Sequence, residues 1–171
     1  MNVTLVRRIT KNAIMLALLC VIGMFALPLG DNIKVSLQLL IVLIIGLTAT
    51  TVFDALIVTA LYLVLGLFMP IYAGFSAGIS PTFGFVISFV VIVIPLYFLN
   101  KLKIKNQFIR MGLACFVALI LCYAIGALFL ALYLRLNIEK ALLIAVVPYL
   151  PFDVAKIIIA TLIVSLLPRK S

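Results

Sequence analysis

The chain has 171 residues, 68% of them hydrophobic, and its mean hydropathy of +1.48 leaves too few polar side chains to cover a soluble globule. Its net charge of +9 would suit a nucleic-acid partner, but the basic residues stand at the boundaries of hydrophobic segments, where they set membrane topology. Composition and charge therefore exclude a soluble protein and disfavour a nucleic-acid-binding one. They indicate an integral protein of the lipid bilayer.

The hydrophobic segments are apolar on every side and long enough to cross about 30 Å of hydrocarbon as helices, which predicts an all-α polytopic protein. The region 35–69 is too long for one span, and its polar stretch of Thr48, Thr50, Thr51 and Asp54 is the expected turn. We expect a six-transmembrane-helix bundle, with residues 1–171 forming a single membrane-embedded domain. Its helices are predicted near residues 10–28, 36–52, 54–69, 82–99, 109–134 and 139–167.

The distribution of basic residues predicts the topology of this bundle. Cytoplasmic loops of membrane proteins carry an excess of Lys and Arg. With a cytoplasmic N-terminus, the outer side has only Lys34, Arg135 and Lys140. The inner side then has Arg7, Arg8, Lys11, Lys101, Lys103, Lys105, Arg110, Arg169 and Lys170. This bias favours six helices with both termini in the cytoplasm.

Two features of the first two helices invite more than one interpretation. Ala13 and Ala17 lie one turn apart and flatten a helix face, so that another backbone can approach closely. The pair fits packing within this bundle or docking of a partner membrane subunit. Gln38 lies just inside the second helix, where a polar side chain needs a partner.

The loop between the third and fourth helices has no charge but many glycines, aromatic rings and hydroxyl groups. Its residues Tyr72, Gly74, Ser76 and Gly78 combine backbone freedom with groups that contact or hydrogen-bond a ligand. This composition fits a loop that closes over a site. It fits equally well a tight crossing between two helices.

The last hydrophobic segment contains the strongest candidate for a site. Asp153 and Lys156 are three residues apart and so share one helical face. Each costs roughly 2.5–3.5 kcal/mol at the centre of a membrane helix, so such residues usually face a protein interior, a partner or a ligand. The alternative to a ligand site is an internal ion pair that only orders helix packing.

Enzymatic chemistry has little support. Histidine is absent, the other acids are scattered at segment ends, and the cysteines lie in apolar segments without metal-like or redox-like spacing. No Gly-rich phosphate loop with its lysine is present, so we do not expect the chain to hydrolyse nucleotide itself. We expect no cofactor and no metal, and any energy for its work must come from elsewhere.

Taken in order and spacing, these stretches resemble the BioY family, the biotin-specific S-components of energy-coupling factor (ECF) transporters. The resemblance rests on the alanine pair, the Ser-Leu-Gln start of the second helix, the Gly-Phe-Ser-Ala-Gly loop at 74–78, and Pro-Thr-Phe-Gly-Phe at 81–85. It is completed by Pro-Phe-Asp-Val-Ala-Lys at 151–156, and it extends over most of the chain.

The resemblance implies a multi-pass subunit in the cell membrane of a prokaryote, which captures a vitamin from outside and is not an enzyme. Ala13 and Ala17 would face a transmembrane coupling subunit that sits on two ATP-binding subunits. Lys156 would neutralise the biotin carboxylate, while Asp153 would accept from the ureido N–H groups or hold the lysine. Tyr72, Gly74, Ser76 and Gly78 would form a lid, and Gln38 would line the site.

Departures from the family pattern leave the substrate open. Phe75, Phe83 and Phe152 stand where glycine is common in the family. These rings would make the pocket more apolar, which would suit lipoate or another carboxylate with an apolar head. A membrane scaffold without a ligand is the second alternative, and transport without the coupling module is a further possibility.

Overall fold

The structure, a computed structural model, describes residues 3–28 and 34–167, and this part of the chain is almost entirely helical. Its elements are α1 (Val3–Met24), β1 (Ala26–Pro28), β2 (Lys34–Ser36), α2 (Gln38–Thr48), α3 (Val52–Phe68), α4 (Phe83–Leu99), α5 (Gln107–Leu134), α6 (Ile138–Ala145) and α7 (Leu150–Leu166). The predicted all-α class is confirmed. The described residues also contain a small antiparallel hairpin, in which Ala26 pairs with Ser36.

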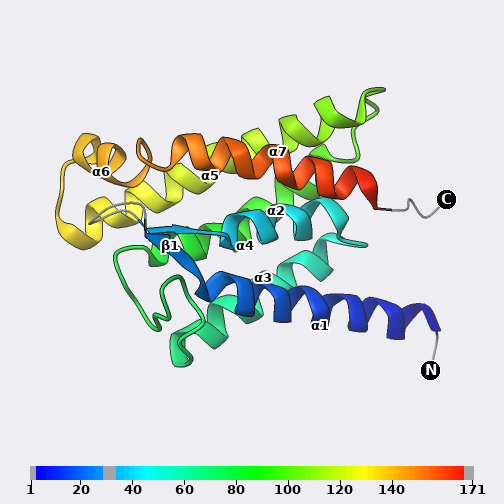
Figure 1. Ribbon diagram of the computed structural model, residues 1–171, viewed down its shortest axis with the longest axis horizontal. Coiled ribbons are helices and arrows are strands. Elements are labelled where there is room, and N and C mark those ends of the chain that lie inside the picture. The colour runs from blue at the N-terminus through cyan, green and yellow to red at the C-terminus, as the bar shows by residue number, and fades with distance from the viewer. Residues whose placement is uncertain (1–2, 29–33, 168–171) are drawn as a thin grey trace.

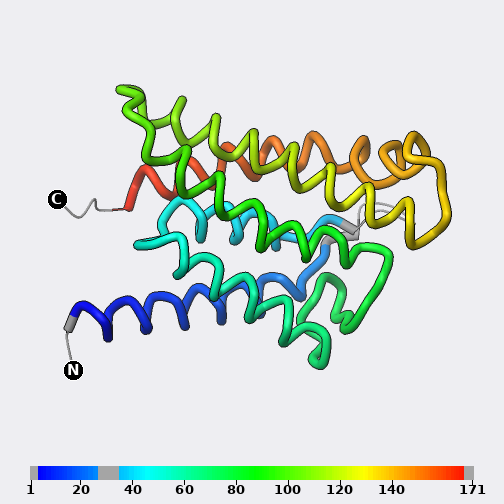
Figure 2. The backbone as a smooth tube through the Cα atoms, turned by 180° about the vertical axis from the view of Figure 1, so that it is seen from behind, coloured from blue at the N-terminus to red at the C-terminus, as the bar shows by residue number. Residues whose placement is uncertain are grey.

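The helices run alternately in opposite directions along the bundle, with α6 and α7 sharing the last pass (Figures 1 and 2). The start of α1 and the end of α7 lie at one end, together with the α4–α5 connection. The opposite end has the hairpin, the α3–α4 loop and α6 (Figure 1). Of the basic residues behind the predicted topology, Arg169 and Lys170 lie outside the described residues.

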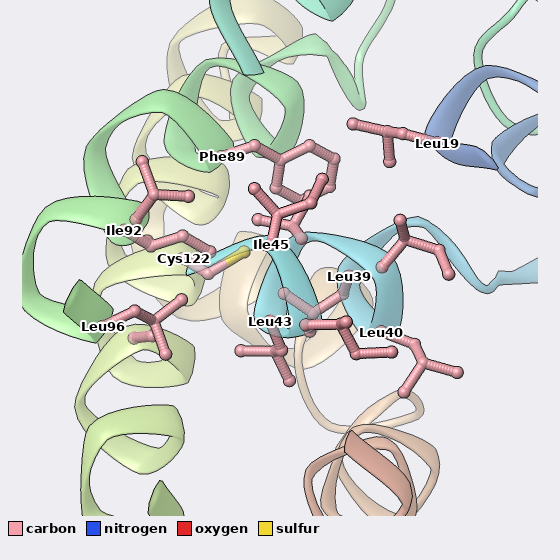
Figure 3. Packing of buried hydrophobic residues seen from close by; sticks show 14 of the residues in the cluster. Leu19, Leu39, Leu40, Leu43, Ile45, Phe89, Ile92, Leu96 and Cys122 are labelled. Atoms are coloured by element: carbon pink, nitrogen blue, oxygen red, sulfur yellow. The ribbon is translucent and has the colours of Figure 1, made fainter. Parts of the chain in front are cut away.

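Helix α2 is the centre of the bundle because its sequence is apolar on all faces. Every residue from 38 to 47 is buried, and the helix packs against α1, α4 and α7. Figure 3 shows the surrounding core. The side chains of α2 shown there are Leu39, Leu40, Leu43 and Ile45, and they lie among Leu19 of α1, Phe89, Ile92 and Leu96 of α4, and Cys122 of α5.

The outer helices expose large apolar side chains along their length, far more than a water-facing surface carries. Within residues 3–28 and 34–167, α5 is the one helix that is both long and apolar enough to cross a membrane, and α6 with α7 adds a second if the bent pair is one span. Helices α2, α3 and α4 are apolar but shorter.

The predicted turn between the second and third helices is confirmed. Thr51 caps α3 by accepting a hydrogen bond from the Asp54 amide, and the Asp54 carboxylate accepts from the Thr51 backbone in return. Asp54 also pairs with Arg8 of α1 at 3.0 Å and accepts from Asn12 at 2.9 Å. These contacts join the first half of α1 to the start of α3.

The prediction of one continuous helix over 139–167 is wrong. The structure breaks it between α6 and α7, whose axes differ by 56°. Pro148 lies in the break and has no N–H for the preceding turn, whereas Pro151 lies in the first turn of α7, where a missing N–H costs nothing. The break brings Tyr149 and the first turns of α7 to the edge of a cavity.

The first two helix boundaries also differ from those predicted. Helix α1 begins at Val3 rather than near residue 10, because its polar first turns remain helical, and it ends at Met24. Residues 26–28 and 34–36 pair as strands instead of extending the helices. Pro28 disfavours helix continuation, and strand pairing satisfies backbone groups at this end of the bundle.

Candidate functional site

A cavity of about 420 Å³ lies at the hairpin end of the bundle, between α2, α4, α5, the α6–α7 break and the α3–α4 loop. This volume is within the range of small-molecule sites, roughly 300–1,000 Å³. Its apolar wall includes Leu39, Phe85, Val86, Phe89, Leu130, Leu134, Ile144 and Ala145. Its polar groups come from Ser36, Gln38, Tyr72, Ser80, Thr82, Tyr123, Tyr149, Asp153 and Lys156.

The two charged residues of the cavity come from successive turns of α7. The Lys156 ammonium donates to Asp153 Oδ1 at 2.7 Å, and the two residues are only 6% and 5% exposed. An ammonium group has three donors, and in the part of the chain that the structure describes Asp153 is its one acceptor. The pair is neutral as a whole, yet it presents unused donors beside the cavity.

Tyr123 of α5 completes this arrangement, and sequence reasoning missed it. Its hydroxyl donates to Asp153 Oδ2 at 2.6 Å, so each carboxylate oxygen has a donor. Hydrogen bonds to an ionised acceptor are the strong ones, and two of them hold this carboxylate in one orientation. The only signal in the sequence was a tyrosine in the apolar middle of this helix.

Gln38 lies on the cavity wall at the start of α2, where it is buried. Its amide donates to the Tyr62 hydroxyl at 2.5 Å, and that hydroxyl donates to the Ile71 carbonyl at 3.0 Å. Gly23 of α1 leaves the space for these two hydrogen bonds, since a Cβ there would lie 2.8 Å from the Tyr62 oxygen. Together the two hydrogen bonds join α2, α3 and the α3–α4 loop.

The four loop residues singled out in the sequence divide in the structure. Tyr72 lies on the cavity wall, and its hydroxyl donates to the Leu63 carbonyl at 2.5 Å. Gly74, Ser76 and Gly78 are not among the lining residues. The two glycines have φ of 73° and 76°, a conformation that other residues rarely adopt, so they shape the turn of the loop.

The three phenylalanines expected to make the pocket more apolar do not line it. Phe83 is buried against Tyr72 and Phe129, while Phe75 and Phe152 are exposed. Phe85 and Phe89 supply the aromatic surface of the cavity instead. That expectation was wrong because a residue's place in the sequence does not give the direction of its side chain around the helix or turn.

Ala13 and Ala17 lie away from the cavity, on an exposed face of α1. Neither packs inside this bundle, because both side chains face outward. The structure thus removes intramolecular packing as the reason for the small-residue pair and leaves a smooth face open to another helix.

Comparison with known proteins relates this architecture to one family. The model of the BioY family matches residues 1–171. The biotin transporter BioY of Thermotoga maritima is 28% identical over 162 residues, which cover 92% of this chain and 93% of that protein. The crystal structure of the S-component for biotin from an ECF-type ABC transporter is similar, with a TM-score of 0.84 and 23% identity. That match covers 96% of this chain and 92% of the other, and at this identity it shows a shared fold.

Proposed function

The chain belongs to the BioY family, and on this basis we propose that it is the S-component of an ECF transporter, which captures biotin for uptake. The observation that carries the proposal is the cavity with its buried Asp153–Lys156 pair. The relatives support it, since one is named a biotin transporter and the other an S-component for biotin. The protein is a transporter subunit rather than an enzyme.

The chemistry of the cavity suits the two ends of biotin. Biotin has a carboxylate tail and a neutral ureido head, so its site needs a cation at one place and hydrogen-bonding groups at another. Lys156 has donors to spare for the carboxylate, while Asp153 already accepts from Lys156 and Tyr123. Of the two roles considered for Asp153, the geometry favours holding the lysine. Gln38 and Tyr72 lie on the polar part of the wall, and Phe85 and Phe89 offer apolar surface to the ring system of biotin.

Gly74, Ser76 and Gly78 act in this proposal as the frame of a loop whose Tyr72 lies on the cavity wall. The lipoate alternative depended on three phenylalanines that do not line the cavity, and neither relative favours it. A ligandless scaffold does not explain why a cavity of about 420 Å³ should contain a buried ion pair.

The protein is a membrane protein, and we propose that it crosses the prokaryotic plasma membrane several times, as one substrate-binding domain with both termini in the cytoplasm. The basic residues at the end where α1 begins support this orientation. The exposed Ala13–Ala17 face then docks the transmembrane coupling subunit. Two ATP-binding subunits on that coupling subunit supply the energy.

Calorimetric titration of the purified chain with biotin, and in parallel with lipoate, tests the proposal. We expect saturable binding of biotin at one site per chain and much weaker binding of lipoate. Preference for lipoate would keep the transporter class but overturn the substrate. Absence of binding by both acids would overturn the assignment as a biotin-capturing subunit.

Replacing Tyr123 by phenylalanine should weaken biotin binding by about tenfold, because Asp153 loses one of two donors and no longer holds Lys156 in one orientation. Calorimetry on the purified variant measures this change. Tyr133→Phe is the matched control, since Tyr133 is on the same helix but does not line the cavity. Unchanged affinity in Tyr123→Phe would show that the hydroxyl does not position the pair.

A further inference from the structure

The side-chain amide of Gln38 lies in the cavity wall, and the hydrogen bonds behind it decide which way it faces. A glutamine amide has a carbonyl oxygen that only accepts and an NH₂ group that only donates. The two groups have nearly the same shape, so packing alone does not distinguish the two orientations. The direction of the amide follows instead from what its neighbours are able to donate or accept.

The hydrogen bonds that fix this direction begin at the Ile71 carbonyl, in the α3–α4 loop. A carbonyl oxygen only accepts, and within residues 3–28 and 34–167 the Tyr62 hydroxyl, at 3.0 Å, is its one donor. A tyrosine hydroxyl has a single hydrogen. Because that hydrogen is used at Ile71, the Tyr62 oxygen is left as an acceptor for Gln38. The NH₂ group of Gln38 therefore faces Tyr62, at 2.5 Å.

Burial keeps this arrangement from reversing. Tyr62 is 0% exposed and Gln38 is 5% exposed, so bulk water does not replace either partner. Gly23 of α1 packs against both side chains, since a Cβ there would lie 2.8 Å from the Tyr62 oxygen and 3.2 Å from Gln38 Cγ. A reversed amide would draw the Tyr62 hydrogen away from the Ile71 carbonyl, and a buried carbonyl without a donor is costly.

The fixed direction leaves the Gln38 oxygen on the cavity side. Gln38 and Ser36 line the cavity, whereas Tyr62 does not. Among the described residues, the one donor to the Gln38 oxygen is Ser36 Oγ at 3.5 Å, longer than an ordinary O–H···O bond. Both carboxylate oxygens of Asp153, by contrast, already have a donor within 2.7 Å. The Gln38 oxygen is therefore an acceptor that the cavity offers to a ligand.

We propose that Tyr62 is a positioning residue of the site, which holds the Gln38 amide so that its oxygen accepts from an N–H group of the ligand. The inference rests on the proposed function, because the ureido head of biotin supplies such a group. An acid without an N–H group, such as lipoate, leaves the buried oxygen unpaired and is disfavoured. Tyr62 thus contributes to specificity through Gln38, without lining the cavity.

Calorimetry on Tyr62→Phe with three acids tests this role. The substitution keeps the ring and its edge contact with Tyr72, whose centroid is 5.5 Å away, and removes only the hydroxyl that sets the direction of the amide. We expect biotin and desthiobiotin, which share the ureido ring, to bind about threefold to tenfold more weakly, the range of one neutral hydrogen bond. The tetrahydrothiophene pentanoic acid that lacks the ureido ring should change by less than about twofold.

Two further variants separate positioning from a general loss of structure. Tyr133→Phe is the control, because Tyr133 does not line the cavity, and its affinities should equal those of the unaltered protein. In Gln38→Met, which has no amide to orient, adding Tyr62→Phe should weaken biotin binding no further. Equal loss for all three acids in Tyr62→Phe, or unchanged affinity for biotin, would overturn the proposal.

Nuclear magnetic resonance of the ligand-free protein gives a second test. The chain has two glutamines, Gln38 and Gln107, so isotope labelling of glutamine side chains yields two amide groups. Gln38→Met identifies the signals of Gln38 by their absence. We expect Tyr62→Phe to move these signals and to leave those of Gln107, at the start of α5, in place.

The two tests fail separately. Absence of biotin binding by the unaltered protein would contradict the proposed function, while the amide signals would still decide whether Tyr62 orients Gln38. Unchanged Gln38 signals in Tyr62→Phe would overturn the positioning role even if the protein binds biotin.

Discussion

Replacing Lys156 by methionine is expected to lower the affinity for biotin by about 10- to 100-fold, the contribution of a hydrogen bond to a charged group. Methionine keeps the unbranched apolar stem and removes the ammonium donors. Calorimetry with biotin and with its amide separates charge from shape, because only the acid needs the cation. The acid should lose most of its affinity and the amide much less.

The substitution also leaves Asp153 as an unpaired buried charge, which by itself can cost about 3–5 kcal/mol of stability. A double variant, Lys156→Met with Asp153→Asn, removes both charges and serves as the control. We expect it to regain stability but not affinity for the acid. Equal loss for acid and amide, or recovery of acid binding in the double variant, would contradict the carboxylate role of Lys156.

Replacing Ala13 and Ala17 together by tryptophan is expected to abolish uptake while leaving ligand affinity within about twofold. Both side chains face outward, so the rings enlarge the docking face without entering the core. Close approach of two helices depends on small residues, and two indoles would hold the backbones apart. Transport in cells and copurification of the coupling subunits measure the loss, and calorimetry in detergent measures the retained binding.

Ala124 supplies the matched control, since it is an exposed alanine on α5 rather than on α1. Ala124→Trp should leave both uptake and copurification unchanged. If the Ala13 and Ala17 variant lost ligand binding in detergent, the pair would instead serve the internal fold. If it still assembled and transported, the docking face would lie elsewhere on the subunit.

Structural features that depend only on residues close together in the sequence could be predicted from it. Long apolar runs predicted the helices, and the polar stretch before Asp54 predicted the turn, where Thr51 indeed caps α3. The spacing of Asp153 and Lys156 placed them on one face, because helix geometry brings residues three apart together. The prolines near residue 150 were visible too, but their effect on the predicted last helix was underestimated.

The partner of Asp153 was not predictable in the same way, because Tyr123 comes from another helix thirty positions earlier in the chain. Its side chain reaches the carboxylate only through the particular rotation and packing of α5 against α7. The same holds for the phenylalanines assigned to the cavity, whose directions are set by neighbouring elements.

The sequence by itself determined the membrane class, the helical fold and the shared face of Asp153 and Lys156, because hydrophobic run length and helical spacing are local properties. Only the tertiary structure decided which side chains share a cavity, that Ala13 and Ala17 face outward, and that Tyr62 accepts from the Gln38 amide. Contacts between distant segments depend on how whole helices rotate and pack to fill the core, and this is a collective property of all their side chains.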